Sequence, residues 1–180
     1  MTVSGSPTLG DIKNKEEVSD KKQGKVATAI TLAVGLVYQD AANGWKNVPA
    51  DGSIDARRIY FNPISIDNSG GVLGDQTGTF YGMNAIVIGT ADLAIVVDDY
   101  CRASVNVVNA FQKLAVPSNS ALNAIFSDTE VEADIDGQRD FSIDKLAKYL
   151  GHAGEITETD NLATDAIDTD ADCLFLIVRS

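Results

Sequence analysis

Two continuous apolar runs lie close together in the middle of the chain. Residues 85–88 read Ala-Ile-Val-Ile and residues 93–97 read Leu-Ala-Ile-Val-Val, with Gly-Thr-Ala-Asp between them. β-branched residues suit pleated strands, and runs without polar alternation are typical of strands covered on both faces. The two runs therefore predict a pair of strands at the centre of the core, joined by a four-residue turn at 89–92.

Shorter β-like segments and turn signals fill much of the remaining chain. Residues 28–39 are rich in Val, Ile, Thr and Leu, Asn43-Gly44 is a hairpin signal, and residues 173–178 form an apolar final strand. Short strands at near-regular spacing predict a mainly β fold, either a β-barrel or a β-sandwich. One to three short helices are expected beside it, at 119–126 and 144–150 and with an ambiguous pattern at 103–115.

Charge divides the chain into three parts. Residues 128–172 hold 14 acidic and three basic side chains, so they carry most of the net charge of −12. They are predicted to form an acidic lobe of a single β-rich domain that covers residues 25–180. Residues 1–24 have few large apolar side chains and are predicted to be a flexible, extended arm that orders on a neighbouring subunit. Its expected partner-binding residues are the lysines in and just after it: Lys13, Lys15, Lys21, Lys22 and Lys25.

The composition opposes several classes of function. A net charge of −12 opposes nucleic-acid binding and binding to anionic membranes, because both need clustered cations. The longest apolar run, 26–38, is too short to span a bilayer, and residues 1–10 lack the apolar region of a signal peptide. Cys101 and Cys173 fit either a disulfide or, preferably, two buried small side chains.

One acidic cluster has the spacing of a calcium loop. Glu132, Asp134 and Asp136 alternate before a glycine, and Asp140 occupies the ninth position. The twelfth position is Ile143, where such loops need a bidentate glutamate. The favoured interpretation is a strand with one solvated acidic face entering a hairpin, and a calcium site is the alternative. No other cofactor is expected.

Catalytic chemistry is poorly supplied, so the chain is predicted not to be an enzyme. His152 is the single imidazole and no Gly-x-Ser-x-Gly nucleophile motif occurs. A group of aromatic residues fits either core packing, which is preferred, or a sugar-binding face: Tyr38, Trp45, Tyr60, Phe61, Phe80 and Tyr81.

Four short motifs resemble the opening of head decoration proteins, the capsid cement proteins of tailed viruses (bacteriophages). They are Gly24-Lys-Val26, Gly35-Leu-Val-Tyr38, Asn43-Gly-Trp45 and Val48-Pro-Ala-Asp-Gly52. Tyr149-Leu-Gly151, the acidic loop after it and a last strand ending in Arg179 are similar to the way such chains close. The resemblance covers residues 24–52 and 145–180 and leaves 53–144 and the arm unmatched.

The resemblance implies a barrel-like structural protein on a virion surface. It implies synthesis in the host cytoplasm, binding to the major capsid protein, a homo-oligomer (a trimer is favoured) and bridging of capsid subunits. Many modest contacts, multiplied by capsid symmetry, would then supply avidity. The alternative from a different class is a calcium- or carbohydrate-binding β-sandwich module.

Overall fold

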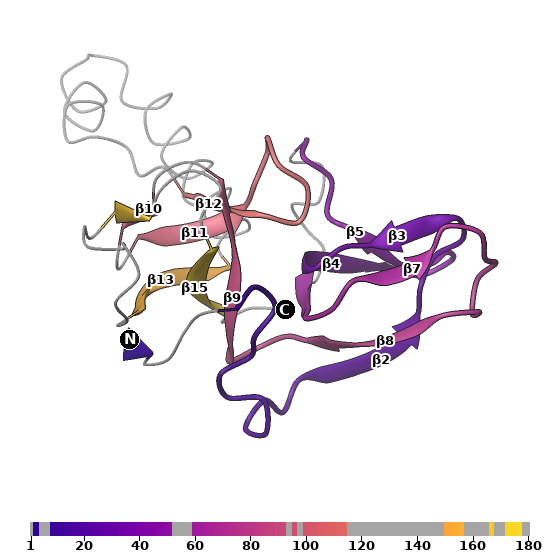
Figure 1. Cartoon of the computed structure of the whole chain (residues 1–180), viewed down its shortest axis with the longest axis horizontal. Helices are drawn as coiled ribbons and strands as arrows, with labels where there is room; N and C mark the ends of the chain where they lie inside the picture. The colour runs from indigo at the N-terminus through magenta and orange to yellow at the C-terminus, as the bar shows by residue number, and fades with distance from the viewer. Residues whose placement is uncertain are drawn as a thin grey trace, which may run out of the picture.

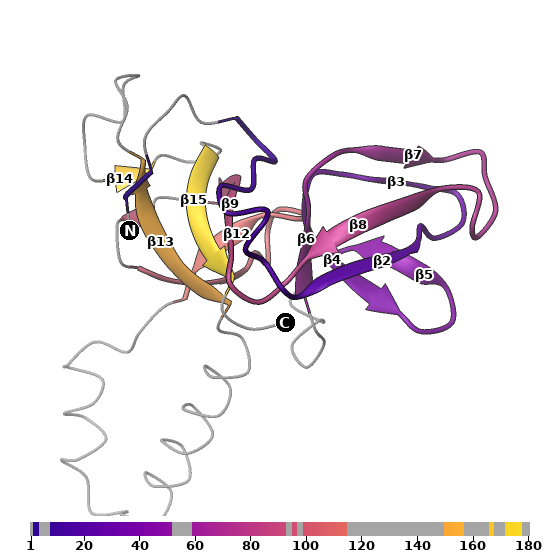
Figure 2. The same ribbon diagram turned by 90° about the horizontal axis from the view of Figure 1, so that it is seen from below.

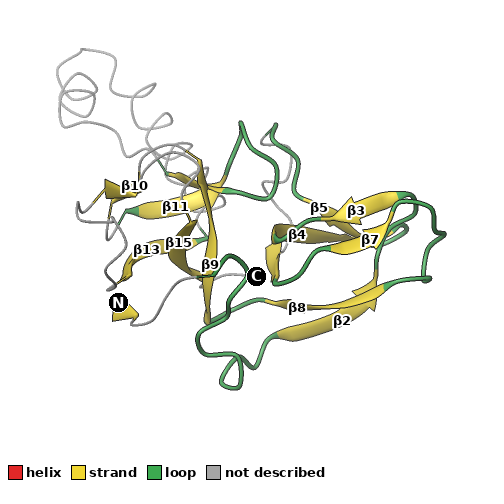
Figure 3. Cartoon of the chain, viewed as in Figure 1, coloured by secondary structure: helices red, strands yellow, loops and turns green. Residues whose placement is uncertain are grey.

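The computed structural model describes residues 2–3, 8–51, 59–92, 95–96, 99–114, 150–156, 166–167 and 172–177. In these residues strands alternate with turns and loops and no helix occurs (Figure 3), which confirms the predicted mainly β class. The strands form two bodies that lie side by side in Figure 1, one with β9 to β15 and one with β2 to β8. The helices expected at 119–126 and 144–150 lie outside the described residues, apart from Leu150.

The first body is a six-stranded sheet in the order β1-β13-β11-β12-β9-β15. Its strands are β1 (Thr2–Val3), β9 (Ala85–Asp92), β11 (Tyr100–Ala103), β12 (Phe111–Lys113), β13 (Gly151–Ile156) and β15 (Asp172–Ile177). β13 also pairs with β15, so the sheet curls strongly. The β11–β13 and β13–β15 pairings each cover two residue pairs among the described residues, and the curled sheet does not close into the β-barrel that was one of the two predicted architectures. A small separate ladder joins β10 (Ile95–Val96) to β14 (Ala166–Ile167).

The predicted central strand pair is wrong in its pairing. β9 continues through the expected turn at 89–92, and its neighbours are β15 and β12, whereas β10 pairs with β14. Gly89 is not a turn residue: it leaves room for an aromatic ring, since a Cβ there would lie 2.6 Å from Phe111 Cε2. The glycine that suggested a turn therefore marks a close packing contact inside a strand.

The second body is a five-stranded antiparallel sheet in the order β2-β8-β6-β4-β5. Its strands are β2 (Lys21–Lys25), β4 (Gly35–Asp40), β5 (Gly44–Asn47), β6 (Ile59–Asn62) and β8 (Thr77–Tyr81). A two-stranded ladder of β3 (Ile30–Leu32) and β7 (Ile66–Asn68) accompanies it. The sheet curls until Val26, next to β2, bridges Trp45 on β5. The hairpin predicted at Asn43-Gly44 is confirmed as the β4–β5 connection.

An aromatic cluster fills the second body. Trp45 stacks on Phe80 with ring centroids 4.1 Å apart and meets Tyr60 edge-on at 5.2 Å, and all three side chains are buried. Gly24 on β2 lies directly against the indole, since a Cβ there would lie 2.0 Å from Trp45 Nε1. The aromatic cluster therefore fixes the position of β2 through a residue that has no side chain.

A second hydrophobic core joins the two bodies. Leu36, Val48 and Phe61 from the second body pack with Val87 and Phe111 from the first, and all five are buried. The rings of Phe61 and Phe111 have centroids 6.5 Å apart. Each sheet thus covers an apolar surface of the other, and the two bodies form one packing unit.

A buried asparagine links the bodies by hydrogen bonds. Asn109, in the loop before β12, donates its backbone N–H to Val48 O (3.2 Å), and its Oδ1 accepts the Val48 N–H (2.9 Å). Its carbonyl accepts the Leu36 N–H (2.9 Å), and its Nδ2 donates to Asn47 Oδ1 (2.6 Å). The ambiguous helical pattern of 103–115 includes this loop and β12, and no helix forms in its described part, 103–114.

Much of the predicted arm lies against its own chain. Ile12 bridges Val87 on β9, the Gly10 N–H donates to Ile88 O (2.9 Å), and the Lys13 N–H donates to Ile86 O (2.8 Å). Val18 is buried, and turns occupy residues 13–17. Figures 1 and 2 both show this indigo segment running beside β9 before it enters β2. Binding of the segment to a neighbouring subunit stays a prediction.

We expect Gly24→Ala to destabilise the protein by about 1–3 kcal/mol, because the added methyl must displace the buried indole of Trp45. Chemical denaturation followed by Trp fluorescence measures the change. Gly70→Ala is the matched control, since nothing lies within 4 Å of a Cβ at Gly70. Equal stabilities for the two variants would contradict this account of β2.

We expect both Asn109→Gly and Asn109→Ala to lower the free energy of unfolding by about 1–3 kcal/mol, because buried partners lose hydrogen bonds. Asn109 has a φ of 61°, so alanine should cost roughly 1 kcal/mol more than glycine. Urea unfolding of both variants separates the side-chain effect from the backbone effect. A glycine variant as stable as the original protein would rule out the side-chain link.

Candidate interaction groove

A groove of about 970 Å³ lies beside β2. One wall is the segment from Leu9 to Lys15, which the contacts with β9 hold in place. Pro63-Ile64 borders this segment, since a Cβ at Gly10 would lie 2.2 Å from Pro63 O, and the floor is the pair β2–β8. Because these pieces come from four separate parts of the sequence, the groove depends on the packing of both bodies.

The register of β2 and β8 determines which side chains form the floor. The Val26 N–H donates to Gln76 O (2.9 Å), and Gly24 and Val26 face the aromatic cluster. Because side chains alternate along a strand, Lys21, Gln23 and Lys25 project from the other face of β2. Opposite them on β8 lie Tyr81, Thr79 and Thr77.

The described part of the groove is cationic. Its carboxylate, Asp11, is paired with Lys13 at 3.0 Å, whereas Lys15 and Lys25 line the groove. Lys21 holds its ammonium 5.8 Å from the centre of the Tyr81 ring. Within the described residues the ion pairs are Lys13–Asp11, Lys46–Asp40 and Lys113–Asp99, so neither Lys15 nor Lys25 has a carboxylate partner there.

The structure thus brings together part of the predicted lysine set. Lys15 and Lys25 share the groove and Lys21 lies at its end, while Lys13 is turned to Asp11 and Lys22 is exposed on β2. The threonines of the floor, Thr77 and Thr79, were not among the predicted site residues. The alternation Thr77-x-Thr79-x-Tyr81 was the signal available for a strand there.

The other predicted sites have different outcomes. Glu132, Asp134, Asp136 and Asp140 lie outside the described residues. Among the residues that are described, no group of three or more His, Cys, Asp or Glu side chains is arranged to hold a metal ion. The preferred core role is confirmed for the five aromatic residues that are buried: Trp45, Tyr60, Phe61, Phe80 and Tyr81. Cys101 is likewise buried in the shared core.

The buried carboxylate of Asp92, near the contact between the two bodies, is held by hydrogen bonds from the loop before β12. The Ser104 hydroxyl donates a hydrogen bond to Asp92 Oδ2, and Asn106 Nδ2 donates to the same oxygen at 3.0 Å. Ser104 Oγ also accepts the N–H groups of Asn106 and Val107, each at 2.9 Å. These contacts shape the loop that presents Asn109, so they serve the link between the two bodies.

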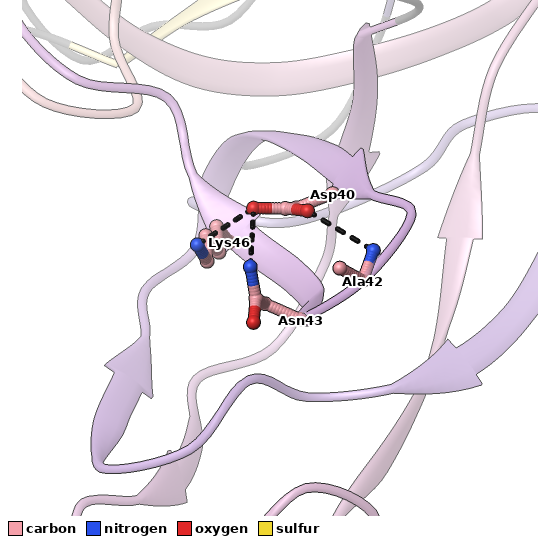
Figure 4. Close-up of polar contacts among 4 residues, drawn as sticks. All are labelled: Asp40, Ala42, Asn43 and Lys46. Carbon is pink, nitrogen blue, oxygen red and sulfur yellow. Dashed lines mark hydrogen bonds and ion pairs between the residues drawn. The ribbon is translucent and has the colours of Figure 1, made fainter.

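The tip of the β4–β5 hairpin carries a compact polar cluster (Figure 4). Asp40 accepts hydrogen bonds from Asn43 Nδ2 (3.0 Å), Lys46 Nζ (2.8 Å) and the Ala42 N–H (3.1 Å). The Asn43 amide, with Lys46 and the Ala42 N–H, holds the pKa of the Asp40 carboxyl well below its usual range. These interactions favour the ionised carboxylate and close the turn.

Comparison of the chain with protein-family models, curated proteins and solved structures finds no match. In the described part of the chain, no helix has the length and apolar character needed to cross a membrane.

We expect Asn43→Ala to raise the pKa of Asp40 toward its ordinary value of about 3.9, because the variant removes the largest stabilising contact of the carboxylate. NMR titration of the Asp40 carboxyl measures this pKa. An unchanged value would contradict the assignment.

The depressed pKa also fixes the sign of a stability effect. Asp40 contributes stability at pH values above its unfolded pKa, and this contribution is lost as the pH falls toward its lower folded pKa. The difference in stability between the original protein and Asp40→Asn should therefore be full near neutral pH and shrink below about pH 4.

Proposed function

We propose that this protein decorates the capsid of a tailed virus and stabilises it by bridging neighbouring capsid subunits. The observation that carries the proposal is the convergence of the motifs that resemble head decoration proteins. Gly24, Val26 and Trp45 come from two of these motifs, and they meet in the aromatic cluster of the second body. Leu36 and Val48 come from the other two and belong to the shared core.

The strong curl of both sheets, neither of which closes into a barrel in the described part of the chain, supports the barrel-like architecture that the resemblance implies. In the first sheet the pairings run through β11, β12, β9 and β15 back to β13, and in the second sheet Val26 bridges Trp45. We propose that such a domain sits on the virion surface as a homo-oligomer, a trimer being favoured, and acts without enzymatic activity.

The charge distribution supports attachment to the major capsid protein through the lysine-bearing surface. Lys15, Lys21 and Lys25 lie together beside β2, on a chain whose net charge is −12. The segment that carries Lys15 is held on the domain by β9, so its cation is presented from a fixed position. Each copy adds modest contacts, and capsid symmetry multiplies them into avidity.

The carbohydrate-binding alternative loses five of its six candidate residues, because stacking on a sugar requires exposed aromatic faces and only Tyr38 is not buried. Trp45, Phe61 and Phe80 are each at most 1% exposed. The calcium-binding alternative rests on residues outside the described part of the chain.

We expect the purified protein to co-sediment with capsids of the virus that encodes it, and to saturate at a fixed high number of copies per particle. Raising the salt concentration should weaken attachment, because about 1 M salt shortens the screening length to about 3 Å. Quantitative gel analysis of pelleted particles measures both effects. Protein that stays in the supernatant at every concentration would refute the proposal.

A further inference from the structure

We propose that the groove beside β2 binds an extended acidic segment of a neighbouring subunit, in which acidic and apolar side chains alternate. The proposal deepens the proposed function and rests on it only in assigning the segment to a capsid subunit. Charge, the composition of the groove and the open edge of β2 each support it.

Charge selects an anionic occupant. Lys15 and Lys25 line the groove without a carboxylate partner among the described residues, and Asp11 is already neutralised by Lys13. On a chain with a net charge of −12, such a local excess of cations is the feature that an acidic partner would recognise.

The composition of the groove selects a segment with two kinds of side chain. The floor offers the hydroxyls of Thr77 and Thr79 and the amide of Gln23, which can bond to carboxylates and to peptide groups. The rim offers Ile64, which is 63% exposed, and Leu9, which is 39% exposed. A segment that alternates acidic and apolar residues would satisfy both sets of contacts.

The edge of β2 favours an extended backbone. The Val26 N–H donates to Gln76 O, next to β8, so hydrogen-bonded pairs alternate along β2 and the N–H and C=O of Gln23 point away from β8. Toward one end the Lys21 N–H donates to Ser19 O (3.1 Å), and toward the other the Val26–Trp45 bridge closes the edge. Between them, no strand among the described residues pairs with this side of β2. The N–H and C=O of Gln23 can therefore hydrogen-bond to the backbone of an extended segment.

A nucleic acid is the competing anion, and the groove suits it poorly. Single strands stack their bases on exposed aromatic rings. The aromatic residue that lines the groove is Tyr81, which is 5% exposed and has the Lys21 ammonium over its ring. The observations therefore favour a peptide.

The test uses the full-length protein and a short peptide of alternating glutamate and valine, with a lysine–valine peptide and a single-stranded oligonucleotide as comparisons. Fluorescence anisotropy measures the affinity of each probe. The combined variant Lys15→Gln/Lys25→Gln should weaken binding of the glutamate peptide roughly tenfold. Lys113→Gln is the control, since Lys113 pairs with Asp99 on the first body.

A second variant separates the groove from diffuse charge. Thr77→Phe fills the exposed floor of the groove, leaves the net charge unchanged and suits a strand, so it should weaken the glutamate peptide at least about fivefold. The unfolding curve of each variant verifies its fold.

Preferential binding of the glutamate peptide, weakened by both groove variants and not by Lys113→Gln, would support the proposal. No binding, equal binding of the lysine peptide, insensitivity to the groove variants, or tighter binding of the oligonucleotide would overturn it. Peptide binding without attachment to capsids would leave the groove assignment standing and refute the capsid function. Capsid attachment that is unaffected by the groove variants would leave the capsid function standing and refute the groove assignment.

Discussion

The packing of the two curled sheets against each other is the constraint on which the rest of the structure depends. Phe61 and Phe111 belong to different sheets, yet both are buried in one core. Apolar surface removed from water stabilises the fold by about 25 cal/mol per Å², so separating the sheets would expose apolar surface on both and destabilise both. Asn109 then fixes the relative position of the sheets, because hydrogen bonds have directions that apolar contacts lack.

This arrangement explains why the groove has a defined shape. Its wall at Leu9–Lys15 is fixed to β9 in the first body, and its floor is part of the second body. A groove between elements of two bodies keeps its width only if the bodies keep their positions. The shared core and the Asn109 link therefore position Lys15 relative to Lys25. They do so indirectly, because the side chain of Asn109 bonds to Val48 and Asn47 and not to either lysine.

The sequence predicted local features better than pairings. The mainly β class and the Asn43-Gly44 hairpin follow from patterns that span a few residues, and both are confirmed. The partner of β9 could not be predicted, because β15 lies about 80 positions further along the chain and its apolar pattern fits many neighbours. The turn predicted at Gly89 is wrong because this glycine accommodates the ring of Phe111, a tertiary contact that the local sequence does not show.

The candidate site shows the same division between local and tertiary information. The lysines were visible as a set, because charge can be counted in a sequence, but their grouping depends on strand parity and on the contacts of the preceding segment with β9. Because side chains alternate along a strand, Lys22 projects from the opposite face of β2 to Lys21 and Lys25, and Lys13 forms an ion pair with Asp11. A cationic groove on an acidic chain is therefore a property of the fold, since the same five lysines on a free arm would carry the same charge without a common direction. That common direction is what allows a small number of cations to select an extended acidic partner by position as well as by charge.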